Sequence, residues 1–165
     1  MTLERLWAGW RSEYVEGAAA ADGCVFCRIL ASDEAGEATY IVRRDAHCAV
    51  VLNAYPYTSG HLMVMPVRHV GELEELTDDE GAGLWHELSD AVRALKAAYA
   101  PDGLNVGANL GRSAGAGVPG HFHMHCVPRW NGDTNFMTTV AETRMLPEAL
   151  PATYEKIRKA WPTDG

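Results

Sequence analysis

Three histidines alternate with apolar residues in the segment His121-Phe122-His123-Met124-His125. In a β-strand successive side chains point to opposite faces, so the three imidazoles would share one face, spaced about 6.6–7 Å apart. Packing accounts for a single histidine in a strand but poorly for a stripe of three. Two kinds of chemistry suit the stripe. A pair of these imidazoles could bind zinc, or a neutral imidazole, whose unperturbed pKa is about 6.5, could attack a phosphorus atom while its neighbours stabilise the phosphate oxygens.

Cys24 and Cys27 form a second candidate site, with the C-x-x-C spacing of half a zinc site. The spacing alone leaves open a metal site, a redox pair or two ordinary thiols. No Cys-His pattern follows at the distance found in a small zinc finger, so we do not expect an independent finger. Cys48 and Cys126 are expected in the core, Cys126 because it would share the apolar face of the histidine strand.

Hydrophobic patterning predicts the elements that must position these residues. Apolar runs bounded by turn residues predict strands at 40–43, 48–52, 61–66 and 104–110, and a fifth strand that begins at His121. A helix is predicted from Thr77 to Ala100, because Thr77 and Glu80 form a capping box and apolar residues then recur at helical spacing. A glycine-rich loop at 111–120 precedes the histidines, and a short helix at 151–161 closes the chain. Strands in series around one long helix favour an α+β fold with an antiparallel sheet.

The composition limits the class of protein. At 165 residues the chain fits one domain. It carries 14 basic and 22 acidic residues, a formal charge of −8, and no run of Lys or Arg, so nucleic acid is not an expected partner. No apolar stretch reaches the roughly 20 residues that span a bilayer, and charges interrupt the N-terminal segment, so neither a membrane partner nor a signal peptide is expected. We therefore expect a cytoplasmic protein whose cysteines are thiols or metal ligands.

The histidine segment resembles the histidine triad (HIT) motif, His-φ-His-φ-His-φ-φ, in which φ is apolar and Val127 takes the last position. The resemblance covers roughly residues 24–137 and includes further residues in the family's order. These are Asn53, Pro56, Gly60, His61, Pro66, Arg68, His69, Asn109, Gly111, Ala114 and Gly115. The tail at 128–137, PRWNGDTNFM, is similar to bacterial diadenosine tetraphosphate phosphorylases rather than to the small phosphoramidase branch.

The resemblance implies a single HIT domain over residues 1–165, with an N-terminal arm at 1–23, a core at 24–137 and a C-terminal extension at 138–165. The implied fold is a sheet of about five antiparallel strands with the long helix packed on one face and a short C-terminal helix. Such proteins form homodimers by joining their sheets near the nucleotide site. We expect the same assembly here.

The resemblance also implies roles for individual residues. His123 would be the nucleophile that takes the nucleoside monophosphate, with His125 and His61 beside the phosphate. Asn53 would hold the ribose hydroxyls, and Asn109 would lie near the phosphates and the leaving group. A turn role is the alternative for both asparagines, since each stands at the start of a turn-rich segment.

The loop before the triad departs from the family pattern. Many members have Gln followed by Ser or Thr there, whereas this loop reads AGAGVPG and offers no such side chain. Backbone N–H groups at Gly115 and Gly117 could bind phosphate instead, unless the loop is only a connector. Trp130, like Trp7 and Trp10, fits a base-stacking or interface residue, although core packing explains most tryptophans.

Some bacterial members hold a structural zinc with a C-x-x-C pair, the histidine after Pro-x-Arg and the first triad histidine. The corresponding residues are all present, as Cys24, Cys27, His69 and His121. The resemblance therefore implies a structural zinc that ties the N-terminal segment to the sheet and removes His121 from direct contact with phosphate. Neither an organic cofactor nor a catalytic metal is expected.

The expected reaction is attack of His123 on an α-phosphorus of diadenosine tetraphosphate. Inorganic phosphate would then resolve the nucleotidyl-histidine to give ADP beside ATP, as in a phosphorylase. Three alternatives stay open: a dinucleoside polyphosphate hydrolase, a nucleoside phosphoramidase, and a nucleotide-binding, zinc-stabilised interaction module without turnover.

Overall fold

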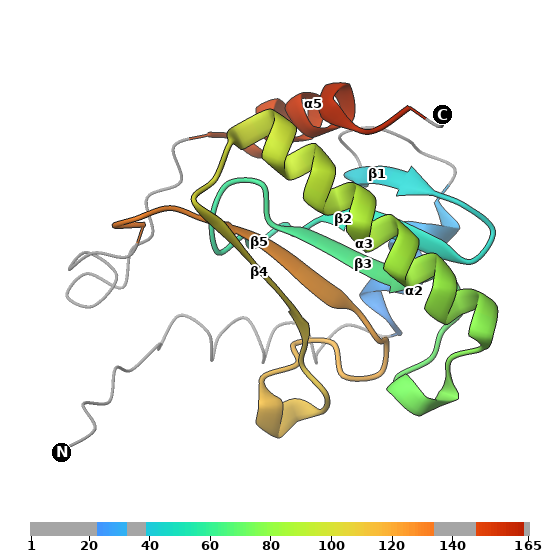
Figure 1. Cartoon of the computed structure of the whole chain (residues 1–165). Helices are drawn as coiled ribbons and strands as arrows, with labels where there is room; N and C mark the ends of the chain where they lie inside the picture. The colour runs from blue at the N-terminus through green and yellow to red at the C-terminus, as the bar shows by residue number, and fades with distance from the viewer. Residues whose placement is uncertain (1–22, 33–38, 134–147, 164–165) are drawn as a thin grey trace, which may run out of the picture.

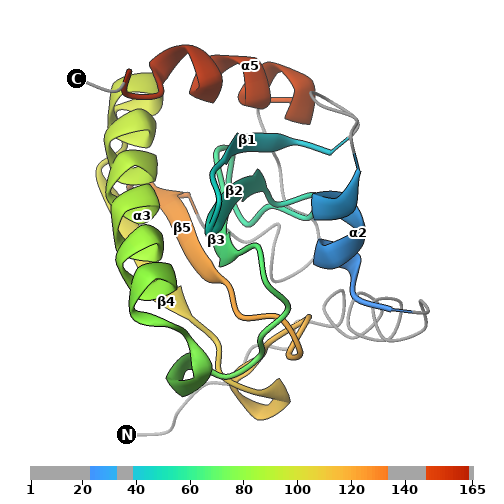
Figure 2. The ribbon, with the colours of Figure 1, turned by 90° about the vertical axis from the view of Figure 1, so that its right-hand side faces the viewer.

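A computed structural model describes residues 23–32, 39–133 and 148–163. Within these residues, one helix lies across one face of a twisted sheet and a second, short helix lies on the other face (Figures 1 and 2). The predicted N-terminal arm, together with Trp7 and Trp10, lies outside the described residues, as do the end of the family-like tail at 134–137 and most of the first half of the C-terminal extension.

The sheet has five strands, all paired antiparallel, in the order β1-β2-β3-β5-β4. Their bounds are β1 Ile41–Arg44, β2 Cys48–Leu52, β3 Leu62–Pro66, β4 Gly103–Ala108 and β5 Met124–Arg129. The central strands β2 and β3 are buried along their whole length, which matches their continuous apolar sequences. The predicted α+β class and the five-stranded antiparallel sheet are confirmed.

The predicted long helix is α3, Asp78–Tyr99. Thr77 caps it through a reciprocal capping box with Glu80, as predicted, and Ala100 ends it in a left-handed conformation at φ 44°. Its buried face carries Leu84, Leu88, Ala91, Ala94 and Leu95, which pack on one side of the sheet together with Cys48 and Cys126. Both cysteines are therefore core residues, as expected.

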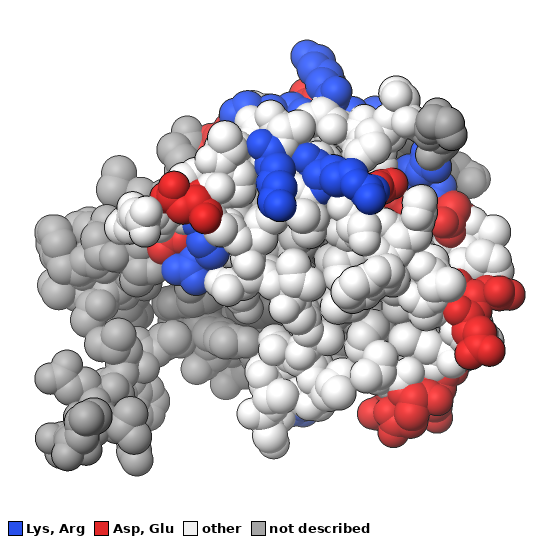
Figure 3. All heavy atoms as spheres, viewed as in Figure 1, with Lys and Arg blue, Asp and Glu red and all other residues white. Residues whose placement is uncertain are grey.

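Charge is distributed unevenly along α3. The first turn carries acidic residues and the last turn carries Lys96, an arrangement that complements the helix dipole. Figure 3 shows acidic side chains gathered at the end where α3 begins, basic ones toward its other end, and a mostly uncharged face between them. On this face the described residues form no continuous basic surface of the kind that binds nucleic acid.

A short helix that the sequence did not predict, α2 at Val25–Ala31, covers the other face of the sheet. Its buried residues Phe26 and Leu30 pack on Ala49, Val51 and Met63 in a second apolar cluster. Seven residues make about two turns, too few for a helical period to be recognised in the sequence. Two short 3₁₀ helices, η2 at Leu73–Glu75 and η3 at Arg112–Ala114, were not predicted either.

Strand β5 begins at Met124, three residues later than predicted. The backbone before it leaves the sheet, because the N–H of Phe122 donates to the carbonyl of Val70 in the loop after β3, at 2.7 Å. The predicted alternation of faces holds nevertheless, since Phe122 and Met124 face the α3 core while the histidines face the other way.

The predicted closing helix is α5, Leu150–Ala160. It packs on the C-terminal half of α3, and its buried Tyr154 donates a hydrogen bond to the carbonyl of Ile41 in the edge strand β1 at 3.2 Å. Among the described residues, no helix combines the length and apolar character needed to cross a bilayer.

Candidate active site and metal site

The triad histidines do not form an evenly spaced row. His123 and His125 lie together, with ring centroids 4.9 Å apart, and His61 at the start of β3 lies 5.1 Å from His125. His121 turns instead toward the cysteines of the N-terminal segment. Both His121 and His123 precede β5, in a segment that bonds to the loop after β3 through the N–H of Phe122.

The proton on His123 can be placed from its hydrogen bond. Its Nδ1 lies 2.8 Å from the carbonyl oxygen of His121, and a carbonyl can only accept. Nδ1 therefore carries the hydrogen, which leaves a lone pair on Nε2. The side chain is 6% exposed, and burial lowers its pKa below the ordinary value despite the hydrogen bond to the carbonyl. A neutral imidazole with a free Nε2 is the form that can act as a nucleophile.

The same reasoning assigns the protonated nitrogens of His61 and His125. The backbone N–H of Tyr57 donates to Nδ1 of His61 at 3.1 Å, so a neutral His61 carries its proton on Nε2. That Nε2 lies 2.9 Å from Nδ1 of His125 and donates to it. His125 then carries its own proton on Nε2, where it can donate to a phosphate oxygen.

Tyr57 is a site residue that sequence reasoning missed. Its ring lies 4.7 Å from that of His61 and stacks at 27° over His125, with centroids 6.1 Å apart. The sequence shows only a turn-rich segment before His61, and no periodicity marks one residue of a turn as functional.

Asn53 is buried beside the histidines. Its Oδ1 accepts the N–H of Tyr55 at 2.9 Å, and its Nδ2 approaches Nδ1 of His61 at 3.4 Å. The structure therefore shows the turn role that the sequence left open, and it also places Asn53 next to His61. Contact with ribose stays a prediction.

Asn109 follows β4, whose last residue Ala108 pairs with Met124. Its side-chain amide lies 3.4 Å from the carbonyl of Gly115, so it joins the strand end to the glycine-rich loop. The φ angle of Gly115 is +95°, a conformation that side chains rarely adopt. Asn109 and Gly115 thus lie near the start of β5. A phosphate contact from Gly117 stays a prediction.

Trp130 lies at the opposite end of β5. It follows His125 by five residues, about 16 Å along a strand at about 3.3 Å per residue. Its ring packs on that of Tyr99, at the end of α3, with centroids 6.2 Å apart. The structure does not bring Trp130 to the histidines of the same chain.

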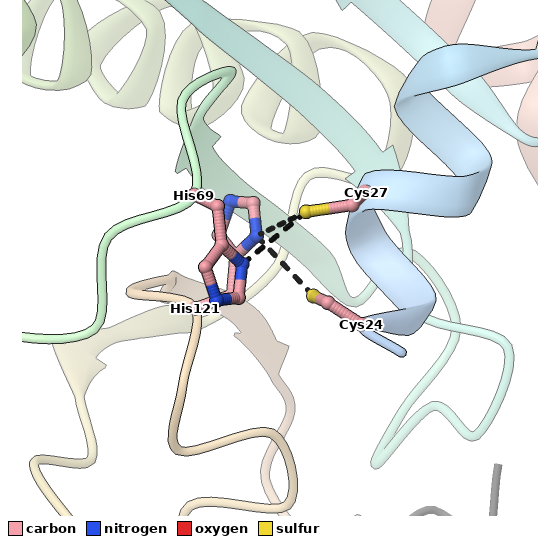
Figure 4. Close-up of side chains that lie close together, drawn as sticks. All are labelled: Cys24, Cys27, His69 and His121. Atoms are coloured by element: carbon pink, nitrogen blue, oxygen red, sulfur yellow. Dashed lines mark hydrogen bonds between the residues drawn. The ribbon is translucent and has the colours of Figure 1, made fainter. Parts of the chain in front are cut away.

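Four predicted metal ligands converge on the α2 side of the sheet (Figure 4). The sulfur of Cys24 lies 3.4 Å from Nδ1 of His121, and the sulfur of Cys27 lies 3.2 Å from Nδ1 of His69 and 3.6 Å from Nδ1 of His121. All four ligand atoms lie within 4.8 Å of one another. In a tetrahedral zinc site, Zn–S and Zn–N bonds of about 2.3 and 2.0–2.1 Å separate neighbouring ligand atoms by about 3.5 Å.

The side chain of His121 has the protonation that metal binding needs. Its Nε2 donates to the carbonyl of Pro66 at 2.9 Å, so the lone pair of Nδ1 faces the cysteines. Burial also lowers the pKa of His121, which keeps the ring neutral. Two sulfur and two nitrogen donors in this arrangement fit zinc.

Comparison with known proteins assigns the chain to a family. The sequence profile of the HIT domain matches residues 35–132. The chain belongs to the HIT family. The AP-4-A phosphorylase of Mycobacterium tuberculosis is 41% identical over 96% of this chain and 85% of its own length. The protein named hit from Bacillus subtilis is 34% identical over 70% of this chain and 77% of its own length. The family prediction made from the triad is thereby confirmed.

Solved HIT structures share the fold of this HIT protein. A histidine triad nucleotide-binding protein from Sulfolobus tokodaii superposes with a TM-score of 0.67 at 32% identity, over 83% of this chain and 91% of that one. A zinc-bound histidine triad protein from Mycobacterium smegmatis gives a TM-score of 0.67 at 28% identity, over 84% of this chain and 92% of that one. The Cys/His cluster of this chain is consistent with such a metal site.

Proposed function

We propose that this HIT protein transfers a nucleotidyl group through His123, by phosphorolysis of diadenosine tetraphosphate to ATP and ADP. One observation carries the proposal: His123 is buried, and the hydrogen bond from its Nδ1 to a carbonyl leaves the lone pair on Nε2 to react. The similarity to the M. tuberculosis AP-4-A phosphorylase over 96% of the chain supports a nucleotide-processing activity and favours this substrate.

The reaction has two displacements. In the first, the lone pair on Nε2 of His123 forms a P–N bond to the α-phosphorus, the bond to the bridging oxygen breaks, and ATP leaves. In the second, an oxygen of inorganic phosphate attacks the same phosphorus, the P–N bond breaks, ADP forms and one proton passes to solvent. His123 keeps its Nδ1 proton throughout, and the Nε2–H of His125 stabilises the phosphate oxygens where charge builds.

The remaining predicted residues complete the site. Asn53 holds the ribose hydroxyls, Asn109 and the backbone of Gly115 and Gly117 bind the phosphate groups, and His61 keeps His125 in its donor form. Cys24, Cys27, His69 and His121 would hold a structural zinc, which would join the start of α2 to the sheet.

The protein acts as a homodimer that brings Trp130 to the site. Strand β4 ends the described sheet, and Gly103 at one end of it pairs with Arg129 while Ala108 at the other end pairs with Met124. If two copies pair antiparallel through β4, the Gly103 end of one β4 lies beside the Ala108 end of the other. The Arg129 end of one β5 then lies at the same edge of the joined sheet as the partner's Met124 end, with the two β4 strands between them. Trp130 of one subunit then reaches the nucleotide bound by its partner.

A product assay tests the proposal. Diadenosine tetraphosphate is incubated with the protein at millimolar phosphate and without phosphate, and the nucleotides are separated. We expect ATP and ADP, with the incoming phosphate in ADP. If the products are AMP and ATP, formed at rates that do not depend on phosphate, the protein is a hydrolase. If it turns over only nucleoside phosphoramidates, it is a phosphoramidase. If it binds nucleotides but turns over neither substrate, it is an interaction module.

A further inference from the structure

Two connections run from the metal-binding segment to the imidazole of His123. The first is the hydrogen bond from Nδ1 of His123 to the backbone carbonyl of His121. The side chain of that same His121 is held at both nitrogens, with Nε2 on the carbonyl of Pro66 and Nδ1 facing the two cysteine sulfurs. Whatever fixes His121 therefore also fixes the acceptor that orients His123.

The second connection is Phe26, which lies between the two cysteines in the sequence. Its ring packs edge-on against both histidines, with centroids 5.5 Å from His121 and 5.0 Å from His123. Only 5% of Phe26 is exposed. The ring that packs on His123 thus belongs to the same short segment, residues 24–27, that supplies both sulfur ligands.

Helix α2 needs such an anchor. It has seven residues, and no side chain caps its first turn. Helices this short are unstable in water unless tertiary contacts hold them. Metal bonds from Cys24 and Cys27 to histidines on the sheet side would fix the start of α2, and with it the position of Phe26.

We infer that Phe26 and His121 are positioning residues that couple metal binding to the orientation of the nucleophile. This inference rests on the proposed role of His123. With the four ligands joined, the carbonyl of His121 and the ring of Phe26 hold His123 in the tautomer whose Nε2 is free. With the ligands separated, the acceptor and the packing ring both move, and the proton is no longer confined to Nδ1.

Phe26→Ala tests the contact between the Phe26 ring and His123, with Leu30→Ala as the matched control. Leu30 is one turn later on α2, similarly buried and in the same apolar cluster, but it has no aromatic ring to pack on His123 as Phe26 does. Both variants should keep their zinc. Phe26→Ala should lower kcat by about 10- to 100-fold with little change in KM, because a small misplacement of a reacting group can cost about 100-fold in rate. Leu30→Ala should keep kcat within about twofold of wild type.

The tautomer of His123 provides a readout that does not need turnover. In ¹⁵N-histidine-labelled protein, with signals assigned through His123→Asn, the zinc-loaded chain should show the proton on Nδ1 alone. Removing zinc with a chelator should give a mixture of both tautomers. Replacing Phe26 by Ala with zinc in place should give a smaller share of the second tautomer, because the carbonyl of His121 is still held. If chelation unfolds the chain, the zinc-loaded Phe26→Ala protein decides.

Two results would overturn the inference: an unchanged Nδ1 tautomer in zinc-loaded Phe26→Ala, or equal losses of kcat in Phe26→Ala and Leu30→Ala. If the wild-type protein turned over no dinucleotide at all, the proposed function would fail. The tautomer measurement would then still show whether the metal site and His123 are coupled.

Discussion

Replacement of Glu80 by Gln should destabilise the loop that carries the predicted metal ligand His69. The carboxylate of Glu80 binds Nε and one terminal nitrogen of Arg68 at 2.8 Å each and accepts the N–H of Thr77 at 2.9 Å. Arg68 also donates to the carbonyl of Glu75, so one ion pair joins the end of β3, the η2 turn and the start of α3. His69 is the residue that follows Arg68.

The expected loss follows from these contacts. A helix cap contributes about 1 kcal/mol, and a hydrogen bond to a charged group about 1.5–3 kcal/mol. The Arg68 side chain is 49% exposed, so water screens its attraction and replaces part of what is lost. We therefore expect a loss of about 2 kcal/mol in unfolding free energy at pH 7. For a chain of this size that is about 4–8 °C in Tm.

The acid dependence gives a second measure of the same contact. Hydrogen bonds from Arg68 hold the pKa of Glu80 at about 2, below its ordinary 4.5. Because the folded pKa is the lower one, this stabilisation is fully present above pH 4.5 and is lost as the pH falls toward 2.

Thermal melts of wild type and Glu80→Gln at several pH values between 7 and 3 would measure both effects. The gap in Tm should shrink toward acid pH, and zinc retention against a chelator should fall in the variant. An equal gap at every pH, or a Tm change below 1 °C at pH 7, would refute the role assigned to this ion pair.

The remaining predictions concern the site. His123→Ala should keep its fold and nucleotide affinity but lose turnover, and retention of more than a few per cent of the wild-type rate would exclude His123 as the nucleophile. Elemental analysis should find one zinc per chain, and none in the double variant Cys24→Ser and Cys27→Ser. The double variant should have a clearly lower Tm and a smaller loss of activity. Zinc retained in that variant would exclude the two cysteines as metal ligands. Mixing His123→Ala with Trp130→Ala should give heterodimers in which one site combines an intact His123 with the partner subunit's intact Trp130. Turnover above that of either variant alone would support a contribution of Trp130 across the dimer. No recovery in proven heterodimers would contradict it.

Local patterns in the sequence predicted the elements and the family. The strands, the capping box at Thr77 and Glu80, and the apolar face of α3 follow from contacts between residues a few positions apart, which periodicity records directly. The triad, the C-x-x-C pair and His69 resemble the family pattern closely enough to predict HIT membership from the sequence alone. Helix α2 was not predicted, because a helix of two turns with two buried residues is too short for helical periodicity to be recognised in the sequence.

The tertiary structure decided which contacts each of these histidines makes. Alternation along a strand predicts three equivalent histidines, but His121 faces a cysteine 97 positions away while His125 bonds to a histidine 64 positions away. The protonated nitrogen of each ring is set by a backbone carbonyl, a backbone N–H or another ring, and those partners come together only when the chain folds. For the same reason the sequence could not show Phe26 against His123, Tyr57 over His125, or Trp130 at the far end of β5. Side-chain type and spacing determine which reactions are available, whereas hydrogen-bond partners distant in sequence determine which nitrogen of each histidine carries its proton.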